Sequence, residues 1–335
     1  MVWHEQNRMR VTYRSDQQVT YLILTLKINM KVLITGGAGY LGTELVKLLT
    51  KNEAVTEIVV YDNLSRNNFN LFLGHKMENH PKVRFVVGDI LDSRSLKKQL
   101  QGVTVVYHLA ANVTTPFSNT DPHFFEQVNH WGTAELVYAI EESEVRKVIY
   151  TSSTSVYGAS KKFVNEDSIP NPRTFYGISK MRGEEHIMRL NDRMDTYILR
   201  CGNVYGYSRS MRFDAVINKF VFEANFKRRI SINGKGNQSR SFIHIDKITR
   251  VLNDVIFSEA PSGIYNVVGK NLTVLDIVDV LKEIYPDLEF NFVNQHLKLR
   301  EINVDPQSKL EAYLTIPHDG DLKQDLINFS NRFSF

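Results

Sequence analysis

Tyr176 and Lys180 carry the clearest chemical signal in the sequence. They lie four residues apart in Tyr176 to Asn191, a segment of helical period, so both side chains fall on one face of a helix. A free tyrosine has a pKa of about 10, and a nearby ammonium group stabilises its phenolate and lowers that pKa. Such a tyrosine can act as a general base towards a substrate hydroxyl. Taken alone, such a pair more often lies on an amphipathic helix without a catalytic role. The residues that precede it therefore determine whether a catalytic interpretation is justified.

A glycine-rich turn near Met30 predicts a dinucleotide site. The β-branched run Lys31 to Thr35 leads into Gly36-Gly37-Ala38-Gly39-Tyr40-Leu41-Gly42 and then into a segment of helical period. Glycines in this context allow a tight turn and a close approach of backbone N–H groups to a pyrophosphate at the start of a helix. The alternative is a glycine-rich turn that binds no ligand. This alternative is disfavoured because the turn lies between a predicted strand and a predicted helix.

Two carboxylates follow the next two predicted strands. Asp62 lies twenty residues beyond Gly42, where it can accept hydrogen bonds from both ribose hydroxyls of an adenosine and repel a 2′-phosphate. This favours NAD over NADP, although Arg66 lies near enough in sequence to pair with a 2′-phosphate. Asp89 follows the third strand and could reach the adenine. Either aspartate could instead be only a turn or helix cap.

Polar residues later in the chain could contact a substrate. Ser152 to Ser155 form a hydroxyl-rich strand end, for which turn capping is the plain alternative. Asn203 follows a strand and can offer its amide to a sugar or phosphate, while Arg240 can bind a diphosphate through two hydrogen bonds. Arg240 by itself would more often be a solvated surface residue. We expect His244 to be structural and, without ligand-like spacing of His, Cys and carboxylates, we expect no metal.

The elements that position these residues alternate between short β-branched runs and longer helical segments. This pattern predicts an α/β fold with a doubly wound parallel (Rossmann) sheet, followed by a smaller C-terminal α/β lobe for the substrate. We expect an extension over 1–29, an NAD-binding domain over 30–200, and a mainly substrate-binding lobe over 201–335 with some segments returning to the Rossmann core. The predicted strands are Lys31 to Thr35, Glu57 to Tyr61, Val83 to Val87, Val103 to Leu109, Lys147 to Ser152 and Thr196 to Arg200, and the predicted helices are Gly42 to Thr50, Ser93 to Leu100, His130 to Glu142, Tyr176 to Asn191 and Val274 to Tyr285.

Composition bounds the class of protein. The 335 residues are 42% hydrophobic and 23% charged, which is ordinary for a globular protein. A net charge of +4 is too small to indicate nucleic acid as a partner. The single cysteine, Cys201, suits a reducing compartment, so we expect the cytoplasm. The apolar run Val19 to Ile28 is too short to cross a membrane, and we expect translation to start at Met30.

Several further motifs occur in a fixed order, and together they resemble the extended short-chain dehydrogenase/reductases. Within that family the chain is similar to the NAD-dependent nucleotide-sugar epimerases and dehydratases, and to UDP-glucose 4-epimerases among them. The resemblance implies NAD(P) in the first lobe, a nucleotide sugar between the lobes, and a homodimer formed through His130 to Glu142 and Tyr176 to Asn191. The matching motifs are Asp89-Ile90, His108 to Ala111, Val128-Asn129 with Gly132-Thr133, Ser152 to Gly158, Tyr176 to Lys180, Asn203 to Gly206, and Arg240 to His244.

The resemblance also implies roles for individual residues. Ser153 takes the position of the family's catalytic hydroxyl, which can hydrogen-bond the reacting oxygen, and it joins Tyr176 and Lys180 as the catalytic set. The expected substrate contacts are Ser153, Thr154, Ser155, Asn203 and Arg240. The expected cofactor contacts are Gly36, Gly39, Tyr40, Leu41, Gly42, Asp62, Asn63, Asp89, Ile90, Leu109, Ala110, Ala111, Asn129, Ser152, Tyr176 and Lys180.

The residues after Ser153 bear on the reaction. Sugar 4,6-dehydratases of the family carry an Asp-Glu pair there, and the glucuronate decarboxylases carry a glutamate in second place, whereas this chain has Thr154 and Ser155. We therefore expect an epimerase that acts at C4 through a transient 4-keto sugar. A 4-keto-sugar reductase that uses NAD(P)H and a dehydratase remain alternatives, as does a dinucleotide-binding protein without catalysis.

Overall fold

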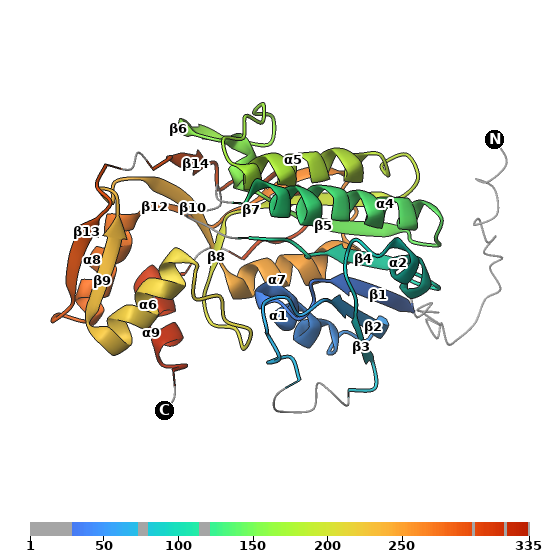
Figure 1. Ribbon diagram of the computed structural model, residues 1–335, viewed down its shortest axis with the longest axis horizontal. Coiled ribbons are helices and arrows are strands. Elements are labelled where there is room, and N and C mark those ends of the chain that lie inside the picture. Colours follow the sequence, from blue (N-terminus) through green and yellow to red (C-terminus); the bar gives the residue numbers. More distant parts are fainter. Residues whose placement is uncertain (1–28, 73–79, 114–120, 297–298, 318–319, 334–335) are drawn as a thin grey trace, which may run out of the picture.

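The computed structural model describes residues 29–72, 80–113, 121–296, 299–317 and 320–333. The extension expected over 1–29 therefore lies outside the described residues, except for residue 29. Two lobes make up the described part of the chain, a larger one around a wide sheet and a smaller one to the left in Figure 1.

A parallel sheet of seven strands forms the centre of the larger lobe within the described residues. The strand order reverses between β1 and β4, which is the switch point of a doubly wound fold, and ligands of such folds bind at the carboxyl ends of the strands there. The predicted fold class is confirmed. In order across the sheet the strands are β11 (Gly263–Val267), β7 (Asp195–Cys201), β5 (Lys147–Ser153), β4 (Val105–His108), β1 (Met30–Thr35), β2 (Val55–Asp62) and β3 (Val83–Val87).

Helices cover both faces of this sheet (Figure 1). On one face the side chains of α1 (Tyr40–Leu49) and α7 (Ile245–Asp254) join the strands in one apolar core. On the other face α2 (Ser93–Gln99), α4 (Gly132–Glu141) and α5 (Phe175–Met188) build a second core. Because both faces are covered, the central strands are continuous apolar runs, and all four residues of β4 are buried.

A π-helix precedes α4, where the sequence predicted only the start of an ordinary helix at His130. It spans Glu126–Trp131 and follows the short helix α3 (Pro122–Phe125). Such wide turns are frequent at functional sites. This one carries Asn129, which is 1% exposed and faces the interior.

The smaller lobe packs three helices against short strands, and their apolar side chains form a third core. Two elements from the same half of the chain, α7 and β11, belong instead to the larger lobe. The helices of the smaller lobe are α6 (Val216–Lys227), α8 (Val274–Ile284) and α9 (Leu322–Ser330). The strands outside the large sheet are β8 (Asn203–Tyr205), β10 (Ser239–His244) and β12 (Lys270–Thr273) in one sheet, β9 (Arg229–Asn233) with β13 (Glu289–Val293), and β6 (Ser160–Val164) with β14 (Ile302–Val304).

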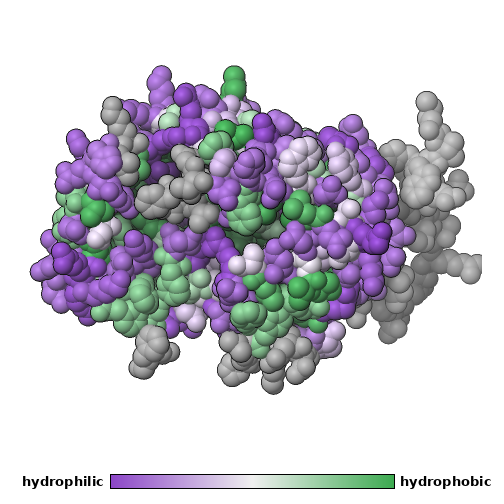
Figure 2. All heavy atoms as spheres, viewed as in Figure 1, coloured by the Kyte–Doolittle hydropathy of each residue, from purple (hydrophilic) through white to green (hydrophobic). Residues whose placement is uncertain are grey.

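The surface is mostly hydrophilic on the face drawn in Figure 2, with hydrophobic side chains gathered in a few patches, two of them along the lower edge. Across the described residues, no helix has both the length and the apolar character needed to cross a membrane.

Candidate active site

A cavity of about 1020 Å³ lies between the carboxyl edge of the large sheet and the smaller lobe. It is lined from the ends of β1, β2, β3, β4, β5 and β7, together with residues of α5 and the smaller lobe. Of the residues predicted for the site, all except Asn129 and Thr154 line this cavity. Its volume is ample for a dinucleotide, because small-ligand pockets span roughly 300 to 1,000 Å³.

The glycine-rich turn forms a cradle that larger residues would close. Gly36 has φ +70°, and a Cβ there would lie 2.6 Å from the backbone nitrogen of Ala110. A Cβ at Gly42 would lie 2.6 Å from the Gly36 carbonyl oxygen. Gly39 precedes α1 without a side-chain cap, so the first N–H groups of that helix are open to an anionic ligand. The turn therefore fits the pyrophosphate of a dinucleotide.

Asp62 ends β2 inside the cavity, where the fingerprint places a ribose ligand. Its Oδ2 accepts a hydrogen bond from Ala38 N at 3.0 Å and its Oδ1 accepts one from Leu64 N at 2.8 Å. Burial raises the pKa of Asp62, and these two backbone hydrogen bonds act against that rise. Because a carboxylate oxygen can accept more than one hydrogen bond, the ribose hydroxyls can still bind it. Asn63 donates to Asp89 at 3.0 Å and so joins the ends of β2 and β3.

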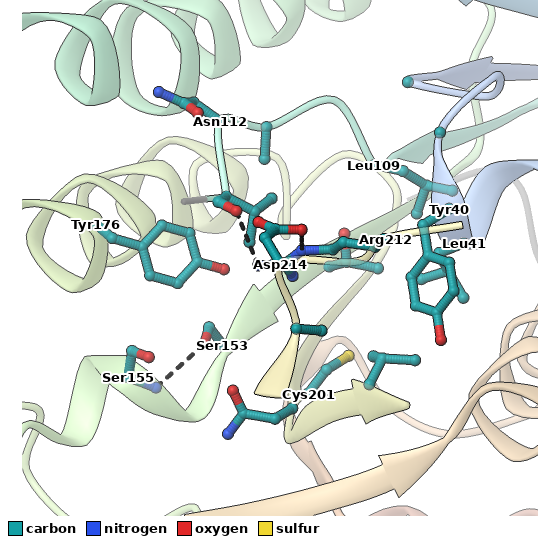
Figure 3. Close-up of a pocket in the computed structure, with 18 of the residues that line it drawn as sticks. Tyr40, Leu41, Leu109, Asn112, Ser153, Ser155, Tyr176, Cys201, Arg212 and Asp214 are labelled. Atoms are coloured by element: carbon teal, nitrogen blue, oxygen red, sulfur yellow. Dashed lines mark hydrogen bonds and ion pairs between the residues drawn. The ribbon is translucent and has the colours of Figure 1, made fainter. Parts of the chain in front are cut away.

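Tyr176 sits at the start of α5, which Thr174 caps by accepting a hydrogen bond from Gly177 N at 3.0 Å. Its side chain points into the cavity towards Ser153 (Figure 3). Burial raises the pKa of Tyr176, while hydrogen bonding with Ser153 and the charge of Arg212 act to lower it. The lowering expected from Lys180 is not seen, because burial dominates and Lys180 is not among the groups that shift this tyrosine.

Lys180 lies one turn further along α5 and is 2% exposed. Its Nζ is 4.2 Å from the ring centroid of Tyr150, a cation–π contact. Burial lowers the pKa of Lys180 to about 7, although Cys201 and Glu184 act in the opposite direction. Lys180 can therefore gain and lose a proton near neutral pH, which suits a group that serves acid/base chemistry.

The two serines at the end of β5 have different surroundings. Ser153 Oγ accepts a hydrogen bond from Ser155 N at 3.2 Å, and its hydroxyl lines the cavity beside Tyr176 (Figure 3). Ser152 Oγ donates to the buried carboxylate of Glu184 at 2.5 Å. Ser153 is thus available to a substrate, whereas the hydroxyl of Ser152 is already engaged.

Two predicted contacts lie outside the cavity. Thr154 is 3% exposed and pairs its hydroxyl with Ser241 at 3.1 Å, because its side chain faces β10. Asn129 accepts from Asn112 N at 2.8 Å and donates to Asn112 O at 3.1 Å. It therefore holds the backbone of Asn112, which lines the cavity, and does not line the cavity itself.

The smaller lobe contributes two arginines. Burial lowers the pKa of Arg240, and the charge of Arg300 adds to that effect. Neither guanidinium has a carboxylate partner within the described residues, although both line the cavity. Asn203 Nδ2 donates to Ser241 O at 3.0 Å, which fixes its amide at the cavity wall. Sequence reasoning found Arg240 but missed Arg300, for which no local pattern gave a signal.

Arg212 and Asp214 were also missed. They lie in the segment between β8 and α6, and Figure 3 shows them in the middle of the cavity between Tyr176 and Tyr40. Arg212 Nε donates to Asp214 Oδ1 at 3.1 Å. An arginine and an aspartate two residues apart in a loop are an ordinary surface pattern, so only the folded chain reveals where they lie.

Comparison with known proteins agrees with this geometry. The model of the NAD-dependent epimerase/dehydratase family matches residues 32–267, more than half of the chain. The chain belongs to this family. Among curated members, human dTDP-D-glucose 4,6-dehydratase is 30% identical over 263 residues, covering 76% of this chain and 73% of that protein. The UDP-glucose 4-epimerase of Mycolicibacterium smegmatis is 33% identical over 234 residues, covering 65% of this chain and 71% of that protein.

Solved structures of similar proteins share the fold over 90% of this chain. The UDP-glucuronic acid 4-epimerase from Bacillus cereus, in complex with UDP-glucuronic acid and NAD, superposes with a TM-score of 0.81 at 27% identity and covers 90% of this chain and 98% of its own. MoeE5 in complex with UDP-glucuronic acid and NAD gives a TM-score of 0.77 at 26% identity, over 90% of this chain and 99% of its own. Epimerases and dehydratases thus both occur among the relatives of this family member.

Proposed function

We propose that this family member is an NAD-dependent epimerase of a nucleotide sugar, acting at C4 with Tyr176 as acid and base. The observation that carries the proposal is the joint placement of Ser153, Tyr176 and Lys180 in the cavity that also contains the glycine-rich cradle. A base, a hydroxyl and a bound dinucleotide suffice for epimerisation through a 4-keto sugar.

The carboxylates of the cavity favour an epimerase over a dehydratase. Among the described residues that line the cavity they are Asp62, Asp89 and Asp214. Asp62 and Asp89 follow β2 and β3 at the adenosine end, and Asp214 is paired with Arg212. Elimination of water needs an acid and a base beside the reacting carbons in addition to the tyrosine. The positions after Ser153 supply a buried threonine and a serine instead.

The residues that would hold the cofactor are the cradle Gly36 to Gly42, Asp62 at the ribose, and the strand end Leu109 to Ala111. When bound there, NAD supplies a hydride acceptor that can return the hydride to the other face of the sugar. Asp62 favours NAD over NADP because a carboxylate repels a 2′-phosphate. Arg66, the residue that could have accepted such a phosphate, is paired with Asp214.

The chain's own residues would perform the proton chemistry. Tyr176 removes the proton from the C4 hydroxyl and later returns it, while the Ser153 hydroxyl hydrogen-bonds the same oxygen as charge develops. Lys180, buried one turn from Tyr176, supplies a cation when protonated. Arg240 and Arg300 bring two positive charges to the cavity that have no carboxylate partner in the described part of the chain, which suits the diphosphate of a nucleotide sugar.

A 4-keto-sugar reductase is the second candidate, because the same serine, tyrosine and lysine would serve it. The two differ in what happens to the cofactor, since a reductase must exchange it at every turnover. The test is to denature the purified protein, identify any released dinucleotide by mass, and incubate fresh protein with UDP-glucose, UDP-galactose, their N-acetyl forms and UDP-glucuronic acid without reductant. Retained NAD with interconversion of a C4 pair is the expected result. Consumption of NAD(P)H only when a 4-keto sugar is supplied would instead identify a reductase.

A further inference from the structure

Asp214 joins two separate segments at the cavity. Its Oδ1 accepts from Arg212 Nε at 3.1 Å, within the loop that joins β8 to α6 in the smaller lobe. The same oxygen lies 3.7 Å from Nη1 of Arg66, which follows β2 in the larger lobe. One carboxylate thus binds cations from both lobes.

The carbonyl oxygen of Val113 completes the junction. It accepts from Arg212 Nη2 at 2.8 Å and from Arg66 Nη2 at 3.1 Å. Val113 follows the end of β4, next to Asn112 and Ala111 in the cavity wall. The dashed lines of Figure 3 show Arg212 joined to Asp214, between Tyr176 and Tyr40.

The loop that carries Arg212 is held in place by further contacts. Asn218, fully buried in α6, donates to the Arg212 carbonyl oxygen at 3.1 Å and accepts from Gly206 N at 3.0 Å. Ser210 pairs its hydroxyl with Thr43 of α1 at 2.7 Å. The guanidinium of Arg212 is therefore presented at a defined place and loses little freedom when it pairs.

The side chains of the junction are partly buried. The side chains of Arg212, Asp214 and Arg66 are 18%, 33% and 40% exposed. Oδ2 of Asp214 is buried and has no hydrogen-bond partner among the described residues. Two arginines and one carboxylate leave one net positive charge, which faces a cavity fitted to a dinucleotide.

We infer that Arg66, Val113, Arg212 and Asp214 form a clasp that closes over the bound dinucleotide and slows its release. Arg66 and Val113 follow β2 and β4, the two strands that flank β1 and its glycine-rich cradle, whereas Arg212 and Asp214 come from the loop between β8 and α6. The four clasp residues line the same cavity as the glycine-rich cradle, so we expect a dinucleotide held at these strand ends to leave more slowly while the contacts between the lobes are intact. The inference concerns cofactor retention and stands apart from which sugar reaction follows.

The test measures release of the dinucleotide in the absence of any sugar. Purified protein is loaded with radiolabelled NAD, diluted into excess unlabelled NAD, and sampled over time by rapid desalting. Asp214→Asn, which removes the shared charge, is expected to speed release by about tenfold, equivalent to about 1.4 kcal/mol. Arg66→Gln is expected to act in the same direction. The double variant Arg66→Gln/Asp214→Asn should release NAD more slowly than the product of the two single effects predicts, because both changes act on one junction.

Lys227→Gln is the matched control. It removes one positive charge and one ion pair with Glu223 from the exposed surface of α6, in the same lobe. Its release rate should equal that of the unaltered chain. Release from Asp214→Asn and Arg66→Gln at the rate of Lys227→Gln would overturn the clasp, as would strict multiplication of the two single effects in the double variant. If circular dichroism shows that Asp214→Asn does not fold, the release rate of Arg66→Gln tests the clasp instead. The Arg66 side chain is 40% exposed, so this substitution should not prevent folding.

Discussion

At the scale of single residues, Tyr176 carries the proposed proton transfer. Tyr176→Phe keeps the ring that packs near Phe125 and removes only the hydroxyl. Activity is expected to fall by roughly 10² to 10⁴, the usual loss when a general acid/base is removed, while NAD is retained. Steady-state rates on the sugar pair identified above, together with the mass of the released dinucleotide, check this. Loss of NAD from the variant would mean that Tyr176 is a structural residue.

His108 makes stability depend on pH. It is fully buried between Thr35 at 2.7 Å and Thr133 at 2.8 Å, and burial lowers its pKa to about 3. The unfolded chain takes up a proton near pH 6.5 while the native state does not, so stability falls as the pH drops below ~6.5, by about 1.4 kcal/mol per unit. Urea unfolding should therefore show about 2 kcal/mol less stability at pH 5 than at pH 7 from this group.

His108→Gln is the variant that isolates this effect. It removes the titrating ring and leaves the other ionisable groups in place, so its stability should change less between pH 7 and pH 5 than that of the unaltered chain. Equal changes in the two proteins would show that His108 does not cause the dependence.

At the scale of elements, a buried ion pair fixes α5 against the large sheet. Glu184 lies on α5, one turn beyond Lys180, and accepts from Arg200 of β7 at 3.0 and 2.7 Å. Both side chains are 2% exposed. Removing one partner of such a pair leaves a buried charge, so Glu184→Ala should lower the free energy of unfolding by about 3 to 5 kcal/mol.

The neighbouring glutamate provides the control for this prediction. Glu185 is exposed on the same helix, so Glu185→Ala should change the free energy of unfolding by no more than about 0.5 kcal/mol. Chemical denaturation of both variants gives the comparison. Similar losses in both would mean that the effect comes from helix propensity and not from the buried pair.

At the scale of the whole molecule, we propose that two copies pair through α4 and α5, as the family resemblance implies. Large apolar side chains are exposed along this surface: Tyr138 of α4 is 40% exposed, Met188 of α5 is 39% exposed, and Trp131, the last residue of the π-helix that leads into α4, is 53% exposed. Trp131→Glu should weaken this pairing and increase the share of monomer in sedimentation at micromolar concentration. Phe163→Glu, on β6 and 66% exposed, is the control and should leave the association unchanged. A monomeric unaltered chain would contradict the proposal.

Features that depend on residues close together in the chain could be predicted from the sequence. Gly36 requires glycine locally because its φ is +70°, and the spacing of Tyr176 and Lys180 is set by one helical turn. Alternating β-branched and helical segments likewise predicted the parallel sheet, and the carboxyl ends of parallel strands meet at one edge. Most of the predicted site residues therefore line one cavity.

Features that depend on contacts between distant residues were decided only by the tertiary structure. Thr154 turns towards Ser241 and away from the cavity, while Arg300 and Arg212 enter it from loops without a recognisable pattern. The pKa of Tyr176 is raised, contrary to expectation, because burial outweighs the charges around it. Spacing along the chain determines which side chains share a face, whereas desolvation and pairing depend on every segment that packs around them.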